Sequence, residues 1–311
     1  MADAALVLTG SPSLAPLLAR GALLSPFKRP APDAEFPRTR LVLPGLRVDL
    51  ARLAAYERVC GFPTGEDALP LTYPHVLGFP LAMRLMSGRD FPLPLLGLVH
   101  TSITVTRHRG TPATGAYELA VRVEGLAPHR RGTEATVVTE VREGGDVVWE
   151  SSSTYLARHR TPRHAGAPGA PGAPGAPGAP GAPGAPGAPG APGAPGAPGE
   201  NVRKPLPAVA EWRLAEDVGR RYAAASGDRN PIHLHPLTAR LFGFPRAIAH
   251  GMWTLARCLA AHGTPDSCHV RAAFKAPVLL PGTVTYAAEN GRFELRDGDE
   301  RVHVAGDVYP A

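Results

Sequence analysis

Two acid–base side chains stand five positions apart in the C-terminal third of the chain. Asp228 and His233 belong to the run SGDRNPIH, residues 226–233. A carboxylate and an imidazole that face one cavity can move protons to and from a substrate. Each residue alone also fits a structural role, the aspartate as a turn former and the histidine as a hydrogen-bonded core residue. Together with Gly251, they favour an acid–base site.

Gly251 lies near the start of an apolar segment with helical spacing, residues 248–261. The first N–H groups of a helix have no partner within it, and they stand at the positive end of its dipole. Such a group can hold an oxygen atom that gains negative charge. Since glycine has no side chain, a ligand carbonyl can approach the backbone closely.

The elements around the pair must bring both side chains to one place. Apolar residues at helical spacing between 214 and 225 predict a helix that ends before Gly227, so Asp228 follows on a turn. Pro231 biases Asn230 away from helical geometry, which predicts an extended or turning segment from 228 to 233. A further short helix is expected from Pro236 to just before Gly243.

The run at 226–233, followed by GF at 243–244 and IAHGM at 248–252, resembles the signature of the MaoC-like (R)-specific enoyl-thioester hydratase and 3-hydroxyacyl-thioester dehydratase family. The resemblance extends over roughly residues 205 to 311. It implies an α+β hot-dog fold, in which an antiparallel sheet wraps around a central helix. It also implies that Asp228 and His233 are the catalytic pair and that the Gly251 amide polarises the thioester carbonyl.

The implied reaction is the reversible hydration of a 2-enoyl thioester to an (R)-3-hydroxyacyl thioester, in fatty-acid or polyketide-type metabolism. It needs no metal or redox cofactor. Asn230 is expected to brace the turn between the two catalytic residues, and His250, inside the matching motif, is a supporting residue without an assigned step. Segment 274–284 resembles the family segment where a basic residue meets a phosphate of CoA or of an acyl carrier protein. Lys275 and Arg271 are the candidates, although both also fit solvated surface cations.

The N-terminal half shows the same order of elements. Segment 50–61 predicts an amphipathic helix and segment 69–88 a buried central helix. Strands with alternating polarity follow, including a hairpin turn at Gly144 and Gly145. Because the C-terminal half repeats a central helix followed by strands, a tandem, or double, hot-dog is expected.

This organisation predicts four segments: a leader at 1–38, a degenerate hot-dog at 39–163, a linker at 164–204 and the catalytic hot-dog at 205–311. The first half lacks the Asp-x-Asn-Pro-x-His run, so it is expected to be catalytically silent and to shape the acyl tunnel. His75, ahead of its central helix, fits a structural role better than a substrate contact. The linker holds eleven Gly-Ala-Pro triplets, which favour a disordered, partly polyproline-II tether over a collagen triple helix.

Composition limits the other function classes. The 311 residues carry a net charge of +6 but no Lys/Arg-rich block with interleaved aromatic residues, which disfavours a nucleic-acid partner. A basic surface also suits a polyanionic acyl carrier. Three cysteines without metal-ligand spacing fit a reducing cytoplasm, and neither a signal peptide nor a membrane-spanning run is expected. A double hot-dog can be a monomer or form a homodimer.

Two alternative functions remain open. Hot-dog thioesterases usually place a carboxylate on or beside the central helix, whereas residues 248–261 contain neither aspartate nor glutamate. A non-catalytic acyl-thioester binding module is disfavoured by the complete set of Asp228, His233 and Gly251, because a degenerate site would be expected to lose one member.

Overall fold

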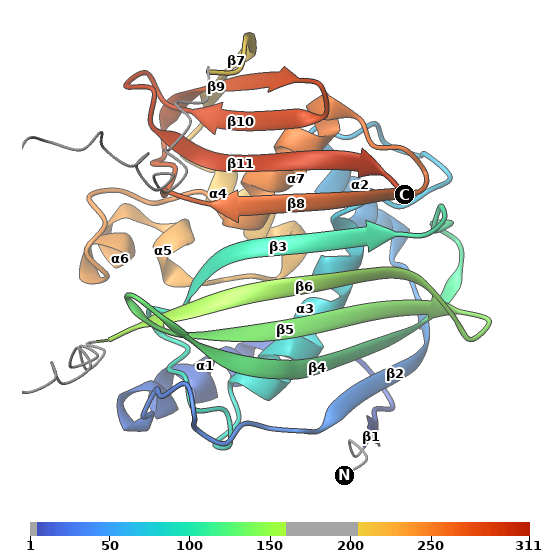
Figure 1. Cartoon of the computed structure of the whole chain (residues 1–311), viewed down its shortest axis with the longest axis vertical. Coiled ribbons are helices and arrows are strands. Elements are labelled where there is room, and N and C mark those ends of the chain that lie inside the picture. Colours follow the sequence, from blue (N-terminus) through green and yellow to red (C-terminus); the bar gives the residue numbers. More distant parts are fainter. Residues whose placement is uncertain (1–4, 160–204) are drawn as a thin grey trace, which may run out of the picture. The chain divides into compact units, whose positions relative to one another are not determined.

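The computed structural model describes residues 5–159 and 205–311 (Figure 1). The predicted tether lies outside these residues. In the described part, one eleven-stranded sheet runs in the order β1-β2-β4-β5-β6-β3-β8-β11-β10-β9-β7. The strands of the N-terminal half are β1 (Ala5–Val7), β2 (Arg40–Arg47), β3 (Val99–Arg107), β4 (Ala116–His129), β5 (Gly132–Glu143) and β6 (Asp146–Arg158). Those of the C-terminal half are β7 (Ala208–Leu214), β8 (Cys268–Phe274), β9 (Gly282–Glu289), β10 (Arg292–Arg296) and β11 (Val302–Pro310).

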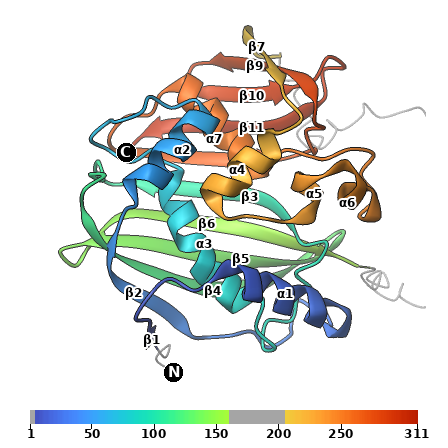
Figure 2. The same ribbon diagram turned by 180° about the vertical axis from the view of Figure 1, so that it is seen from behind.

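Helices α2, α3, α4 and α7 lie on one face of this sheet (Figure 2). The helices of the N-terminal half are α1 (Leu14–Leu24), the 3₁₀ helix η1 (Ser25–Phe27), α2 (Leu50–Cys60) and α3 (Tyr73–Met86). Those of the C-terminal half are α4 (Val218–Ser226), α5 (Pro231–Leu234), α6 (Pro236–Leu241) and α7 (Gly251–His262). No helix in the described residues is long and apolar enough to cross a membrane.

The two halves repeat one strand order. In the first half it is β2-β4-β5-β6-β3, and in the second half it is β7-β9-β10-β11-β8. Each half has a central helix, α3 or α7, directly before the strand that borders the other half, β3 or β8. Antiparallel pairing of β3 with β8, which places Ser102 opposite Ala273 and Arg107 opposite Cys268, joins the halves into one sheet. The predicted α+β tandem hot-dog fold is confirmed.

Local sequence explains the boundaries of the helices. Asp49 accepts hydrogen bonds from the amides of Ala51 and Arg52 at 3.0 and 3.1 Å, so its side chain satisfies two free donors at the start of α2. Gly61, with φ of +80°, ends that helix in the left-handed conformation. Helix α3 is buried along most of its length, in agreement with its apolar sequence.

Two segments differ from the sequence-based expectation or go beyond it. Segment 228–233, predicted to be extended or turning, contains the single-turn helix α5. Pro231 occupies its first position, where a missing N–H costs nothing, and Asn230 keeps non-helical geometry as predicted. The sequence left the leader undetermined, whereas the structure places α1 there, and Leu14 at its start packs against Gly227.

Candidate active site

Three ionisable side chains converge beside the start of α7. Asp228 lies on the turn after α4, His233 on α5 and His250 directly before α7. One potential ligand atom from each of them lies within 4.8 Å of those of the other two. The fold therefore brings together the predicted pair and the supporting histidine.

The turn that carries Asp228 is held by its own side chains. Gly227 takes φ of +85°, a conformation that favours glycine, and so ends α4. The Asp228 amide donates to Ser226 Oγ at 3.2 Å, and Asp228 Oδ1 accepts from the Asn230 amide at 3.2 Å. Asn230 Oδ1 in turn accepts from the Ile232 amide at 3.4 Å, at the start of α5. Asn230 thus links the turn to the helix that carries His233.

His233 is buried, and its orientation is fixed by the backbone. Its Nδ1 lies 2.8 Å from the carbonyl oxygen of Ile248, which can only accept a hydrogen bond. Nδ1 therefore carries the proton, and in the neutral ring Nε2 keeps a lone pair. Burial lowers the pKa of His233, although the negative charge of Asp228 and the Ile248 carbonyl act in the opposite direction. Nε2 is thus suited to accept a proton.

His250 stacks on His233 with ring centroids 3.7 Å apart and planes 25° apart. Its Nε2 donates to the backbone carbonyl of Asp228 at 3.0 Å, while the Asp228 carboxylate Oδ2 lies 3.9 Å away. Burial, and then the charge of His233, hold the pKa of His250 well below its usual range. His250 is therefore a neutral ring that supports both members of the pair.

The pKa of the Asp228 carboxyl is shifted in the opposite direction to that of His233. Burial raises its pKa, and the His233 charge and the Asn230 N–H only partly offset this effect. Its side chain keeps 29% of its surface exposed, so it remains accessible to a small molecule. An acid whose pKa is raised beside a base whose pKa is lowered is the arrangement that enzymes use to exchange protons near neutral pH.

Gly251 is the first residue of α7, so its N–H has no acceptor within the helix. A Cβ atom at this position would lie 3.2 Å from the aromatic ring of Phe274. The glycine therefore lets this ring pack directly against the start of the helix. The free N–H, at the positive end of α7 and next to His250, is placed to hold a developing oxyanion.

Two residues of the N-terminal half approach the site, and sequence analysis missed both. Arg52 on α2 donates to the carbonyl oxygens of Ala225 and Ser226, at 2.7 and 2.8 Å. Tyr155 on β6 is buried. Burial raises the pKa of its hydroxyl, a hydrogen bond with Ser153 lowers this pKa, and the charge of Asp228 raises it. No local pattern could have identified them, because Arg52 and Ser226 are 174 positions apart.

The two predicted phosphate-binding residues have different locations. On β8, Val270 and Ala272 are buried, whereas Arg271 between them is exposed on the opposite face, where its Nε donates to His269 Nε2 at 3.1 Å. The structure therefore does not bring Arg271 to the catalytic pair. Lys275 is exposed directly after Phe274, whose ring packs on Gly251, so it stays close to the site.

Among the described residues, Asp228, His233 and His250 are the group of donors that could hold a metal ion. His233 Nδ1 and His250 Nε2 already bond to backbone carbonyls, which leaves one ring nitrogen on each residue for other partners. The expectation that the reaction needs no metal stays a prediction.

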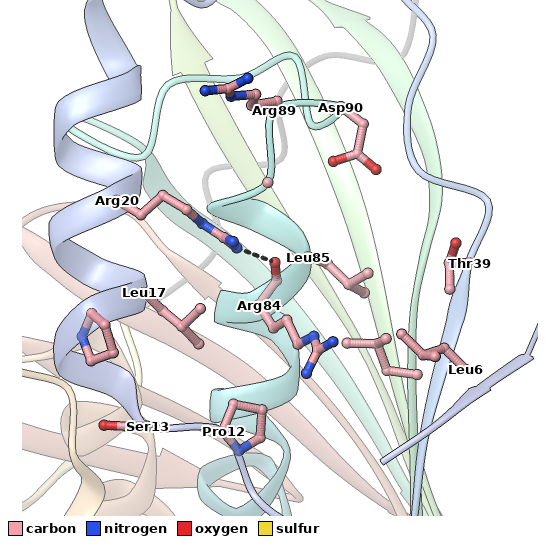
Figure 3. A pocket seen from close by; sticks show the side chains of 13 residues that line it. Leu6, Pro12, Ser13, Leu17, Arg20, Thr39, Arg84, Leu85, Arg89 and Asp90 are labelled. Atoms are coloured by element: carbon pink, nitrogen blue, oxygen red, sulfur yellow. Dashed lines mark hydrogen bonds between the residues drawn. The ribbon is translucent and has the colours of Figure 1, made fainter.

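A separate pocket of about 520 Å³ lies between α1, the end of α3 and β2 (Figure 3). Arg20 donates to the Arg84 carbonyl at 3.1 Å on its wall, and Arg89 and Asp90 also line it. Leu17 and Leu85 give it an apolar side. The lining residues include neither a histidine nor any member of the site around Asp228.

Comparisons with known proteins agree with the geometry. A family model described as MaoC like domain matches residues 196–309. A second model, the collagen triple helix repeat, matches residues 161–204, where glycine recurs at every third position. The chain is 37% identical over 265 residues to 3-hydroxyacyl-thioester dehydratase X of Mycobacterium tuberculosis, which corresponds to 84% of each sequence.

Solved structures show the same fold. A crystal structure of HtdX of Mycobacterium tuberculosis matches with a TM-score of 0.69 and 33% identity, over 88% of this chain and 100% of that one. The MaoC-like dehydratase of Phytophthora capsici matches with a TM-score of 0.63 at 16% identity, over 88% of this chain and 94% of that one. The extent of the sequence match to dehydratase X and the family model shows that the chain belongs to the MaoC-like family of 3-hydroxyacyl-thioester dehydratases.

Proposed function

We propose that this chain catalyses the reversible dehydration of (R)-3-hydroxyacyl thioesters to 2-enoyl thioesters, with Asp228 and His233 as the catalytic pair. The observation that carries the proposal is the 2.8 Å hydrogen bond from His233 Nδ1 to the Ile248 carbonyl, which leaves Nε2 free as a base beside the Asp228 carboxyl. The 37% identity to a 3-hydroxyacyl-thioester dehydratase supports the reaction class.

In dehydration, neutral His233 takes the proton from C2 of the substrate through Nε2. The electron pair of that C–H bond forms the C2–C3 double bond by way of an enolate. The C3–O bond then breaks, and protonated Asp228 gives its proton to the departing oxygen, so that water leaves. Imidazolium and carboxylate remain, and transfer of one proton from His233 to Asp228 restores the starting state. The raised pKa of Asp228 and the lowered pKa of His233 both favour this neutral starting pair.

In this reaction the enolate oxygen is the thioester carbonyl oxygen. It accepts a hydrogen bond from the Gly251 N–H, and the positive end of α7 adds to this stabilisation. One such donor is worth about 3–4 kcal/mol in other enzymes. Hydration follows the same path in reverse, as water is deprotonated by Asp228 while His233 returns a proton to C2.

The remaining site residues have supporting roles in this proposal. Asn230 and His250 hold the turn and the two catalytic side chains through the contacts described above. Lys275 meets a phosphate of CoA or of a carrier protein, because it is an exposed cation next to the Phe274–Gly251 contact. The N-terminal half supplies no second pair and contributes to the acyl site.

The test is hydration of crotonyl-CoA and of a longer 2-enoyl-CoA, followed by the loss of the near-ultraviolet absorbance of the conjugated thioester. Asp228→Asn should lower kcat by at least about 100-fold, since the acid–base group is removed while its shape is kept. Asp299→Asn, a change on an exposed loop, is the matched control and should leave kcat unchanged. Chiral analysis of the product should find the R isomer.

The same chains attached to an acyl carrier protein distinguish the two carriers. Activity on the carrier-bound substrate alone would identify the carrier protein as partner. Absence of hydration with both carriers would contradict the proposal and favour a binding module. Full activity of Asp228→Asn would show that other residues do the chemistry.

A further inference from the structure

Several buried polar groups of the N-terminal half are not used by the proposed mechanism. Within residues 5–159 and 205–311, no hydrogen-bond partner is present for Nδ1 of His75, Nε2 of His100 or Oγ of Ser151, and the hydroxyl of Ser153 has only that of Tyr155 beside it. The exposed fractions are 9% for His75, 3% for Ser151 and 2% for Ser153. Buried polar atoms without a partner cost free energy, so a group of them indicates that a polar ligand binds there.

The two serines point toward the central helix rather than to the outer face of the sheet. On β6 they pair with Val137 and Thr139 of β5, and directly opposite residues of a sheet share a face. Thr139 lies against Gly78 of α3, since a Cβ atom at this glycine would come within 2.6 Å of it. Apolar side chains usually fill such an inner face, whereas here hydroxyl groups occupy it.

Ring contacts connect the two histidines with the catalytic site. The Phe274 ring, which packs on Gly251, lies 4.8 Å from the His100 ring between centroids. His100 stacks on Tyr155 at 4.6 Å and on His75 at 5.8 Å. Tyr155 is close enough to Asp228 for the carboxylate charge to act on its pKa. Side chains in contact therefore lead from Gly251 to the two histidines, and Tyr155 extends this path to Ser153.

The charge state of the histidines limits what they can bind. Burial lowers the pKa of His75 to about 4. Burial, and then the charge of His75, hold the pKa of His100 well below its usual range. Both rings are therefore neutral near pH 7. His100 bonds to the Ser102 backbone, which leaves its Nε2 as an acceptor, and Nδ1 of His75 is the second ring nitrogen without a partner. A neutral hydroxyl or carbonyl group fits them, while a carboxylate would be buried without a counter-charge.

We propose that His75, His100, Ser151 and Ser153 form a polar subsite that binds a hydroxyl or keto oxygen on the acyl chain beyond C3. The preferred substrates are thus thioesters of oxygen-substituted chains rather than plain alkyl chains. This inference rests on the proposed function, because the acyl chain must extend from Gly251 past Phe274 into the N-terminal half. An alkyl chain would give these polar groups no hydrogen-bond partner, whereas one hydroxyl group can both donate and accept a hydrogen bond.

The experiment compares kcat/KM for 2-enoyl-CoA substrates of equal length that carry no substituent or one hydroxyl group at successive carbons beyond C4. With the hydroxyl group at one of these carbons, kcat/KM of the wild-type protein should be at least about tenfold higher than for the unsubstituted chain. Sites built to hydrogen-bond a hydroxyl group discriminate against substrates that lack it. His100→Phe keeps a ring between Tyr155 and Phe274 but removes Nε2. The ratio of kcat/KM for the hydroxylated chain to kcat/KM for the alkyl chain should fall to about one in this variant. His108→Phe, at an exposed position just after β3, is the matched control and should keep the preference.

Equal or faster hydration of the alkyl chain by the wild-type protein would overturn the inference and assign the subsite to buried water. A preference that persists in His100→Phe would also overturn it. Calorimetric affinities of saturated acyl-CoA with and without the hydroxyl group separate this result from failure of the proposed function, since they need no turnover. Tighter binding of the hydroxylated chain that is lost in His100→Phe supports the subsite even where no substrate reacts, and equal affinities contradict it.

Discussion

The guanidinium group of Arg52 donates a hydrogen bond of 2.8 Å to the carbonyl oxygen of Ser226. A second bond, of 2.7 Å, reaches the carbonyl of Ala225. The last carbonyls of a helix have no partner within it, so Arg52 satisfies two groups at the end of α4. Gly227 and Asp228 follow directly. The N-terminal half, whose sequence lacks the Asp-x-Asn-Pro-x-His run, therefore helps to hold the turn that carries Asp228.

Replacement of Arg52 by methionine tests this role. The variant keeps a long side chain but loses both hydrogen bonds, so the turn with Asp228 gains freedom. We expect kcat to fall about 10- to 100-fold, because small displacements of catalytic groups have such effects. Unfolding in urea should show a loss of about 1–3 kcal/mol for the unpaired carbonyls.

Arg58→Met is the matched control on the same helix, since Arg58 is exposed and contacts neither carbonyl. It should leave kcat unchanged. An Arg52→Met protein that is less stable but fully active would show that Arg52 contributes to stability alone.

Much of the site could be predicted because its core is local in sequence. Asp228, His233 and Gly251 span twenty-four positions, and the turn chemistry of Gly227 and Asn230 is readable from residue types. The family resemblance implied the hot-dog fold, and the repeated order of one central helix before several strands predicted two copies of it. Short-range signals of this kind act through backbone preferences that do not depend on the rest of the chain.

The parts of the site that could not be predicted depend on contacts between segments that are far apart in the sequence. Arg52 is a surface-type residue on an amphipathic helix, and only the packing of α2 on α4 gives it carbonyl partners. Arg271 was predicted to meet a phosphate of CoA or of a carrier protein. Alternation along β8 places it on the face opposite the buried Val270 and Ala272, and its phosphate contact stays a prediction. That alternation was visible in the sequence. The electrostatic influence of Asp228 on Tyr155 was not, since no sequence pattern relates them.

Gly251→Ala should damage catalysis without breaking the fold. The added Cβ would meet the Phe274 ring at 3.2 Å, so either the ring or the start of α7 must shift by a few tenths of an ångström. A misplaced N–H stabilises the enolate poorly, and we expect kcat to fall about 100-fold with a smaller change in KM. The measurement is steady-state hydration of crotonyl-CoA together with the melting temperature.

Gly298→Ala provides the control, because a Cβ there meets no atom within 4 Å. Its kcat and melting temperature should equal those of the wild-type protein. An unchanged kcat in Gly251→Ala would place the oxyanion donor elsewhere.

His250→Phe separates the stacking of His250 from its hydrogen bond. Phenylalanine keeps a ring against His233 but cannot donate to the Asp228 carbonyl, which then loses its 3.0 Å partner. We expect kcat to fall about tenfold, as the turn is less well fixed, while KM changes little. His262→Phe, at the opposite end of α7, is the control and should leave kcat unchanged. Equal kcat values of the two variants would argue against a positioning role for His250.

The pH dependence of stability tests whether His75 is held neutral in the folded protein. An unfolded histidine gains a proton below about pH 6.5, whereas burial lowers the pKa of folded His75 to about 4. Between these values the unfolded state binds one more proton, so the free energy of unfolding rises with pH there. His75 should thus contribute about 3 kcal/mol at pH 7 that is lost as the pH falls to 4. Urea denaturation at a series of pH values should therefore give a steeper curve for the wild-type protein than for His75→Phe, by about 1.4 kcal/mol per pH unit in this window.

The exposed change His108→Phe should follow the wild-type curve through the same window. Parallel curves for the wild-type protein and His75→Phe would mean that His75 titrates alike in both states, and the buried polar subsite would then carry a charged ring.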